Sequence, residues 1–448
     1  MATIVGMRGF LASSIGVTCA AALALPLTLP AASHAAPAPA RESVPGSTQS
    51  LALGSLAADR AVGAAREQGL PQRDVRPFSL VGVVWDDPNT ELHGQVQVRT
   101  RTTGTTTWSA WQDVETHNDD APDLDSSEHT SGHVRGSTAP LWVGDSDGVE
   151  VRVKADEPAA TRAAAEPLPK GLRLELVDPG AEPPPQGAPV DAARATTLTA
   201  ETAASSAVNA ELAPLGATAV PALTKKATED ELIEARGGDA SATKARPYVG
   251  ARPRIITRKG WGADEKLREK QFGYTKTVKA AFVHHSASGN NYRCSQASSV
   301  IRSIYRYHVK SSGWRDIGYN FLVDKCGNIY EGRAGGVAKP VMGAHTLGFN
   351  TNSMGIAVLG SFGGSNPPAA AVNAIARLTA WKLGLYGANP RGTTYLKSGG
   401  GNLYRKGKNV RLHVISGHRD GFATECPGRR LYNKLGKARS SSAHLQGR

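Results

Sequence analysis

Two short segments in the C-terminal half of the chain carry residue types that could bind a metal ion. His284 and His285 end one apolar run, and His418 and Cys426 follow another. A catalytic zinc site uses three protein ligands, such as imidazoles and a thiolate, and keeps a fourth position for water. The helical His-Glu-x-x-His motif of metalloproteases does not occur in the sequence. By spacing alone, His418 and Cys426 are a weak indication of a metal site.

The apolar runs that lead to these residues predict buried strands. The segments "VKAAFVHH" (278–285) and "VRLHVISGH" (410–418) are rich in β-branched and other apolar residues. A strand holds a ligand on a rigid backbone, and the strand end leaves the open side of the site facing solvent. Because neighbouring side chains on a strand face opposite sides, we expect His285 to point away from a metal bound by His284.

The rest of the C-terminal region, residues 251–440, predicts helices that alternate with strands. Residues 298–310 and 367–385 have apolar residues at helical spacing. Residues 318–332 have the pattern of a β-hairpin with its turn around Cys326-Gly327-Asn328, and residues 354–362 predict a further buried strand. We therefore expect an α/β fold, with a mixed central β-sheet flanked by helices.

Residues 75–180 have a different pattern, in which apolar and polar residues alternate with period two. The runs "QVQVRTR", "GVEVRV" and "GLRLELV" predict a small antiparallel β module, with a sandwich as the expected form. The module contains no cluster of catalytic residue types, so we interpret it as accessory. Its tryptophans could form a sugar-stacking platform, but core aromatics are the favoured interpretation: Trp85, Trp108, Trp111 and Trp142.

Low-complexity segments separate these regions. Residues 36–74 are rich in Ala, Pro and Ser and are expected to be disordered or loosely packed. Residues 181–250 predict a Pro/Ala-rich linker, in which residues 225–236 form either one helix or a solvated charged stretch. Residues 1–35 have the pattern of an export signal, with a membrane anchor as the alternative. No other stretch is apolar enough to cross a bilayer, so the mature protein is expected to lack a membrane span.

Charge is distributed unevenly along the chain. Residues 251–448 contain 32 Lys and Arg against 8 Asp and Glu, a net charge of +24, so the total of +13 leaves −11 for residues 1–250. A basic exported module suits an anionic partner such as cell-wall polymers with carboxylates and phosphates. The sequence contains no nucleic-acid-binding motif, and export argues against a nucleic-acid partner. A basic surface that serves solubility alone is the remaining alternative.

From about Pro253 to Gly436, the chain resembles the superfamily of peptidoglycan recognition proteins and phage-type N-acetylmuramoyl-L-alanine amidases. The resemblance is carried by five segments in order: "RKGWGAD" (258–264), "FVHHSASG" (282–289), "GWRDIGYNFLVDKCGNIYEGR" (313–333), "GAHTLGFNTNSMGIAVLGSF" (343–362) and "GHRDGFATECPG" (417–428). The long N-terminal extension with a β module resembles the actinobacterial members.

The resemblance implies roles for the matching positions. His284, His418 and Cys426 match the ligands of a zinc ion (Zn²⁺), and Tyr319 matches the catalytic tyrosine. Thr424 occupies a position that is Lys in phage enzymes and often Thr in recognition proteins. This departure from Lys leaves the contribution of Thr424 to catalysis open.

The implied function is zinc-dependent hydrolysis of the amide bond between N-acetylmuramic acid and L-alanine in peptidoglycan or muropeptides. The protein would then be secreted and associated with the cell wall. A first alternative is a recognition protein that binds peptidoglycan without cutting it, although such members commonly lack the cysteine ligand. A second is a cell-surface protein in which the β module does the main work.

The pairing of the remaining cysteines follows once this ligand set is accepted, and most of the remaining histidines are interpreted from their places in the predicted elements. With Cys426 as a ligand and Cys19 lost with the signal, Cys294 and Cys326 are left to form a disulfide, as an exported protein permits, and two free thiols are the alternative. We interpret His308 and His413 as structural. His345 stays open between substrate contact and structural support.

Overall fold

The computed structural model describes residues 45–56, 66–116, 120–156, 167–181, 209, 218–238 and 247–448. The predicted export signal, residues 1–35, lies outside the described residues. Among the described residues, none of the helices combines the length and the apolar character needed to span a bilayer.

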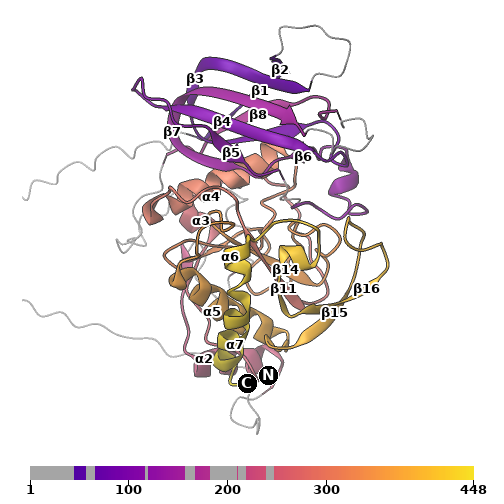
Figure 1. Ribbon diagram of the computed structural model, residues 1–448. Coiled ribbons are helices and arrows are strands. Elements are labelled where there is room, and N and C mark those ends of the chain that lie inside the picture. Colours follow the sequence, from indigo (N-terminus) through magenta and orange to yellow (C-terminus); the bar gives the residue numbers. More distant parts are fainter. Residues whose placement is uncertain are drawn as a thin grey trace, which may run out of the picture. The chain divides into compact units, whose positions relative to one another are not determined.

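The N-terminal part forms an eight-stranded sheet in which every pairing is antiparallel (Figure 1). The sheet follows the order β1-β8-β3-β7-β4-β5, with β2 and β6 paired to β3. Its strands are β1 (Ser47–Ala52), β2 (Gly54–Ser55), β3 (Glu67–Trp85), β4 (Gly94–Thr102), β5 (Gln112–Val114), β6 (Gly136–Ser137), β7 (Leu141–Ala155) and β8 (Arg173–Asp178). The alternating valines of β4 and β7 are buried, which confirms the period-two prediction.

One prediction for this region is wrong. Strands β1 and β2 and the first part of β3 lie within residues 36–74, which were expected to be disordered or loosely packed. Strand β1 pairs with β8 over its whole length, and these backbone hydrogen bonds stabilise a strand whose own residues are mostly polar or small.

The tryptophans are divided between core and surface. Trp85 and Trp142 are buried, as expected for core aromatics. Trp108 and Trp111 are only half-buried, and the guanidinium of Arg99 lies 5.8 and 5.1 Å from their rings. Stacking against arginine therefore replaces core packing at these two positions.

The C-terminal part is built on a seven-stranded mixed sheet with the order β17-β11-β14-β12-β13-β10-β9. Its strands are β9 (Ala219–Val220), β10 (Ile255–Ile256), β11 (Ala280–His285), β12 (Phe321–Val323), β13 (Ile329–Glu331), β14 (Ser353–Val358) and β17 (Ile415–Gly417). Strand β11 is parallel to both β14 and β17, whereas β12 and β13 form the predicted antiparallel hairpin.

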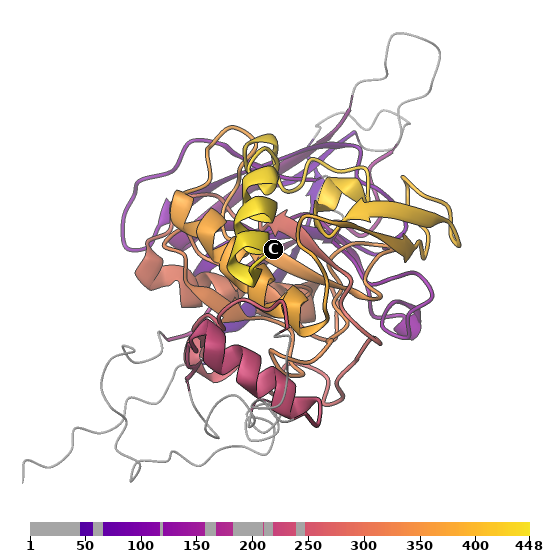
Figure 2. The same cartoon turned by 90° about the horizontal axis from the view of Figure 1, so that it is seen from below.

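Helices cover both faces of this sheet, which confirms the predicted α/β fold class. On one face, α5 and α7 pack against each other (Figure 1, Figure 2) and share a core with the strands. On the other face lies α4, whose chain continues as a π-helical turn over Tyr307–Ser311. The helices are α2 (Lys225–Ala235), α3 (Arg258–Trp261), α4 (Ala297–Arg306), α5 (Ala369–Leu385), α6 (Arg429–Tyr432) and α7 (Leu435–Gln446).

The sequence patterns left the structure of one segment undecided and predicted that of another wrongly. Helix α2 shows that the charged stretch in the predicted linker is helical, with the Thr224 hydroxyl accepting a hydrogen bond from Ala227 N. The run at 410–418 was expected to be one strand but forms two. Its first half, β16 (Asn409–His413), pairs with β15 (Thr393–Lys397) in a separate ribbon with alternating exposure, and its second half enters the central sheet as buried β17.

The two sheets belong to one compact unit and meet at α4. Leu80 and Trp142 of the N-terminal sheet share a core with Ile301 and Ile304 of α4. Just beyond α4, the Tyr307 hydroxyl donates a hydrogen bond of 3.1 Å to Thr138 O. The predicted β module is therefore packed onto the C-terminal region.

Candidate metal centre

Two neighbouring parallel strands bring the first two candidate ligands together. The register of β11 and β17 pairs Val283 with Gly417, so His284 and His418 follow at the same end of adjacent strands. Cys426 returns to this point in the loop after His418, where its carbonyl accepts a hydrogen bond of 3.0 Å from Arg419 N. The three potential ligand atoms lie within 4.8 Å of one another, and all three residues are completely buried.

A fourth potential ligand comes from the N-terminal part of the chain. Oδ1 of Asp120 lies 2.9 Å from Nδ1 of His284 and 3.3 Å from Nδ1 of His418. Nδ1 of His284 is also 3.7 Å from Sγ of Cys426. In a tetrahedral zinc site, with Zn–N near 2.0–2.1 Å and Zn–S near 2.3 Å, neighbouring ligand atoms are about 3.3–3.6 Å apart. The observed spacing is close to these values.

Unsatisfied polar atoms at the same point also fit a cation. Both ring nitrogens of His418 and Oδ1 of Asp120 are buried and have no hydrogen-bond partner among the described residues. Burial lowers the pKa of His284 and of His418 to about 3, so both imidazoles are neutral at pH 7 and offer lone pairs. Burial raises the pKa of Asp120 to about 7. Lone pairs that converge without a donor between them are the arrangement that a metal ion would satisfy.

Tyr319 lies beside this cluster. It lies two residues before β12, and β12 pairs with β14, the neighbour of β11. Its ring centroid is 5.6 Å from that of His284, and its hydroxyl donates a hydrogen bond of 2.5 Å to Oδ2 of Asp120. The Asp120 carboxylate therefore links the candidate catalytic hydroxyl to the two candidate histidine ligands.

Thr424 has a different contact. Its side chain is half-buried, and Oγ1 accepts a hydrogen bond of 3.2 Å from Cys426 N. This bond restrains the backbone that carries the thiol.

The four other histidines considered from the sequence lie outside the cluster. His285 points away from it, as expected, and Nε2 lies 3.0 Å from Oε1 of Glu115. His345 is buried against the His284 ring, with Nδ1 3.0 Å from Oγ1 of Thr346. His308 is buried, as expected for a core histidine, whereas His413 is exposed on β16.

The cysteines are divided as expected. Cys294 and Cys326 form a disulfide, and Cys426 is buried and takes no part in a disulfide. The disulfide joins the start of the α4 region to the turn of the β12–β13 hairpin. It leaves the Cys426 thiol available to a metal.

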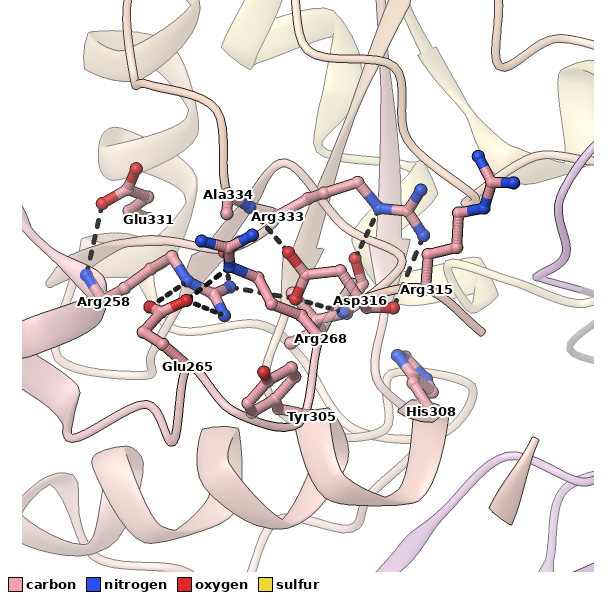
Figure 3. A network of polar contacts seen from close by, with 12 residues as sticks. Arg258, Glu265, Arg268, Tyr305, His308, Arg315, Asp316, Glu331, Arg333 and Ala334 are labelled. Carbon is pink, nitrogen blue, oxygen red and sulfur yellow. Dashed lines mark hydrogen bonds and ion pairs between the residues drawn. The ribbon is translucent and has the colours of Figure 1, made fainter. Parts of the chain in front are cut away.

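A buried network of charges supports the segment that carries Tyr319 (Figure 3). In this network, Arg258 Nε lies 2.7 Å from Glu265 Oε1 and Arg258 Nη1 lies 3.0 Å from Asp316 Oδ1. Asp316 Oδ2 also accepts a hydrogen bond of 2.8 Å from Ala334 N. Breaking one of these buried pairs would leave a charge without a partner. The network therefore restrains the chain on both sides of Tyr319.

Sequence patterns missed Asp120. It lies in a segment interpreted as an accessory module without catalytic residues, far from His284 in sequence. An excess of acidic residues in the N-terminal half was visible, but charge excess does not identify which carboxylate reaches the cluster. Only the packing of the N-terminal sheet on α4 brings it there.

Comparisons with known proteins agree with this division of the chain. A family model described as N-acetylmuramoyl-L-alanine amidase matches residues 274–429, and one described as Rv3811 N-terminal galactose-binding domain-like matches residues 32–170. The chain is 30% identical over 183 residues to peptidoglycan-recognition protein SC2 of Drosophila melanogaster, which covers 40% of this chain and 84% of the relative. It is 30% identical over 208 residues to the N-acetylmuramoyl-L-alanine amidase of Homo sapiens, covering 44% of this chain and 30% of the relative. A solved structure of Drosophila PGRP-LB is 27% identical, covers 40% of this chain and 91% of its own, and has a TM-score of 0.32.

Proposed function

Because this chain belongs to the family of peptidoglycan recognition proteins and N-acetylmuramoyl-L-alanine amidases, we propose that it is a zinc-dependent amidase. Its reaction is hydrolysis of the bond between the lactyl group of N-acetylmuramic acid and L-alanine in peptidoglycan or muropeptides. The observation that carries the proposal is the convergence of His284, His418 and Cys426 within 4.8 Å, in a site with orphaned lone pairs.

Each residue of the site has a task in this proposal. His284, His418 and Cys426 hold the zinc, which when bound supplies Lewis acidity and lowers the pKa of a coordinated water to about 7. Tyr319 offers its hydroxyl to the oxygen on which negative charge develops, a contribution of about 3 kcal/mol for one positioned donor. Thr424 holds the Cys426 backbone in place through the bond to Cys426 N.

The alternative is a recognition protein that binds peptidoglycan and does not cleave it. The presence of a cysteine ligand, two histidine ligands and a tyrosine at one site supports the enzyme. Binding alone would need neither a thiolate nor a positioned hydroxyl.

The test measures metal content and newly released amino groups of L-alanine on purified peptidoglycan. His418→Asn is compared with the matched control His413→Asn, which changes an exposed histidine on β16. We expect wild type and His413→Asn to bind about one zinc per chain, in line with one three-ligand site, and to release amines. His418→Asn is expected to lose both properties.

Binding without cleavage would give a different result. In that case wild type, and the Asp120→Asn variant described below, would retain zinc and bind peptidoglycan but release no amine. That outcome would overturn the amidase proposal and leave the family assignment intact.

We also propose that the protein acts outside the cytosol at the cell wall. The disulfide between Cys294 and Cys326 supports an oxidising compartment, and the +24 charge of residues 251–448 supports an anionic polymer as partner. Cell fractionation is expected to place the protein in the wall fraction, from which high salt releases it. Mass spectrometry of the purified protein is expected to show Ala36 as its first residue, if residues 1–35 are the removed signal.

A further inference from the structure

A carboxylate of the chain itself lies against the candidate metal centre. A catalytic zinc site keeps its fourth position for water and substrate. Here the Asp120 side chain is 4% exposed, and its Oδ1 faces both His284 and His418. Its other oxygen accepts the hydrogen bond from Tyr319. One carboxylate therefore engages both the metal ligands and the candidate catalytic hydroxyl.

The chain on the C-terminal side of Asp120 is anchored to the C-terminal region. We call residues 120–128 the acidic segment, because it contains Asp120, Asp123, Asp125 and Glu128. Oδ1 of Asp123 accepts hydrogen bonds of 2.7 Å from Gly348 N and 2.8 Å from Asn350 Nδ2. The same Asn350 accepts a hydrogen bond from His345 N, and the His345 ring contacts the ring of His284. The Asp123 anchor is therefore connected to a candidate ligand through Asn350 and His345.

A stronger anchor lies at the end of the acidic segment. Glu128 and Arg333 form a bidentate pair, with nitrogen–oxygen distances of 2.8 and 2.9 Å and side-chain exposures of 5% and 8%. Arg315 N donates a further hydrogen bond of 3.0 Å to Glu128. Separating a buried bidentate pair leaves an uncompensated charge, so the pair resists removal of the segment.

A third contact lies before the acidic segment. Glu115 lies 3.0 Å from Nε2 of His285, the residue next to a candidate ligand. Asp120 is thus held between contacts on both sides. The opposite net charges of the two halves of the chain, −11 and +24, favour the same association.

We propose that Asp120 is a fourth metal ligand and that the described conformation is a latent form of the enzyme. The inference rests on the proposed amidase function. Carboxylate oxygen is an ordinary zinc ligand, so Asp120 would add a fourth protein ligand to His284, His418 and Cys426. With His284, His418, Cys426 and Tyr319 all buried, peptidoglycan reaches the site only after the acidic segment has moved away.

The test uses the full chain with Asp120→Asn and the matched control Asp125→Asn. Both variants replace one carboxylate of the acidic segment by an amide. Asp125 contacts Lys406 at 3.0 Å, with side-chain exposures of 58% and 66%, and is not at the metal centre. Circular dichroism shows that each variant is folded before the comparison.

Two measurements read the metal site directly. Cobalt(II) replaces zinc, and its visible spectrum reports the ligand set. The rate of zinc transfer to a chelator reports how closed the site is. For Asp120→Asn we expect a changed cobalt spectrum and zinc transfer faster by about tenfold or more. Loss of a residue that supports a metal site typically weakens metal binding by about 10–100-fold. Asp125→Asn should match the wild type in both.

Amine release from peptidoglycan gives the third measurement. The rate of amine release is proportional to the fraction of molecules in which the acidic segment has moved away from the site. If the closed form exceeds this open form by about tenfold or more, Asp120→Asn should raise the initial rate by the same factor. Asp123→Ala removes an anchor without changing any ligand. It should raise the rate and leave the cobalt spectrum of the closed form unchanged.

Two outcomes would overturn the proposal. An unchanged cobalt spectrum in Asp120→Asn would show that Asp120 is not a ligand. A lower amine-release rate with unchanged zinc transfer would show that Asp120 takes part in the reaction instead of blocking it. If the spectrum and transfer rate change as expected but no variant releases amine, the ligand assignment stands and the amidase proposal fails.

Discussion

Tyr319 donates a hydrogen bond to Asp120, a residue of the N-terminal part of the chain. The tyrosine precedes β12 of the mixed sheet, whereas the aspartate follows β5 of the antiparallel sheet. The bond joins the two parts of the chain at the candidate metal centre. Substitutions that weaken this junction are therefore expected to affect the reaction as well as stability.

Tyr319→Phe removes the candidate donor to the developing negative charge. We expect amine release in the Asp120→Asn background to fall by about 100-fold, the usual effect of losing one such donor. Zinc content should stay the same, because Tyr319 is not a ligand. The comparison variant is Tyr395→Phe, which changes an exposed tyrosine of β15. An equal loss in both variants would contradict the assigned role.

Removal of zinc is expected to destabilise the fold. Without a cation, the lone pairs of His418 and Asp120 converge in a buried site with nothing to satisfy them. At a zinc concentration of about 1,000 times the dissociation constant, binding stabilises the folded state by about 4 kcal/mol. Thermal unfolding should therefore shift downward with a chelator and return on addition of Zn²⁺. Recovery with Ca²⁺, which prefers oxygen ligands, would argue against a His and Cys site.

Gly82→Ala tests the contact between the N-terminal sheet and the C-terminal region. A Cβ at this position would lie 2.3 Å from the hydroxyl oxygen and 2.5 Å from ring carbons of buried Tyr307. Overpacking of this kind costs about 1–3 kcal/mol. We expect lower stability and faster amine release, because the sheet that carries Asp120 is loosened. Gly54→Ala is the control, since a Cβ there meets no atom within 4 Å. Lower stability with an unchanged rate of amine release would show that this contact does not control access to the metal centre.

Stability is expected to fall in mild acid through His308. Burial, reinforced by Arg333, lowers the pKa of His308 to about 3, and Nδ1 accepts a hydrogen bond from Gly318 N. The unfolded chain, with an ordinary pKa near 6.5, binds the proton first as pH falls. The stabilisation is therefore complete above about pH 6.5 and declines towards pH 3, with about 2 kcal/mol lost by pH 5.

The variant His308→Asn keeps an acceptor for Gly318 N but does not titrate in this range. Urea unfolding at pH 7.5 and pH 5 should show the stability difference between wild type and variant shrinking by about 2 kcal/mol. A difference that is constant with pH would show that His308 does not stay neutral in the folded protein.

The sequence alone determined the local elements and the candidate ligands of this protein. Strand β11, the β12–β13 hairpin and the alternating valines of β4 and β7 follow from periodicities that each segment carries within itself. The resemblance to the amidase family pointed to His284, His418 and Cys426, and these residues do converge. The disulfide partners are the two cysteines that remain when the ligand Cys426 and Cys19 of the predicted signal are set aside, and they do pair.

Tertiary structure alone decided the rest. Strand β1 exists because β8 lies beside it, and residues 410–418 divide because one half joins a ribbon and the other the central sheet. The position of Asp120 depends on the packing of the N-terminal sheet against α4 and on the Glu128–Arg333 pair. The physical reason is that a segment's own sequence sets its periodicity, whereas contacts between distant segments depend on which surfaces bury each other.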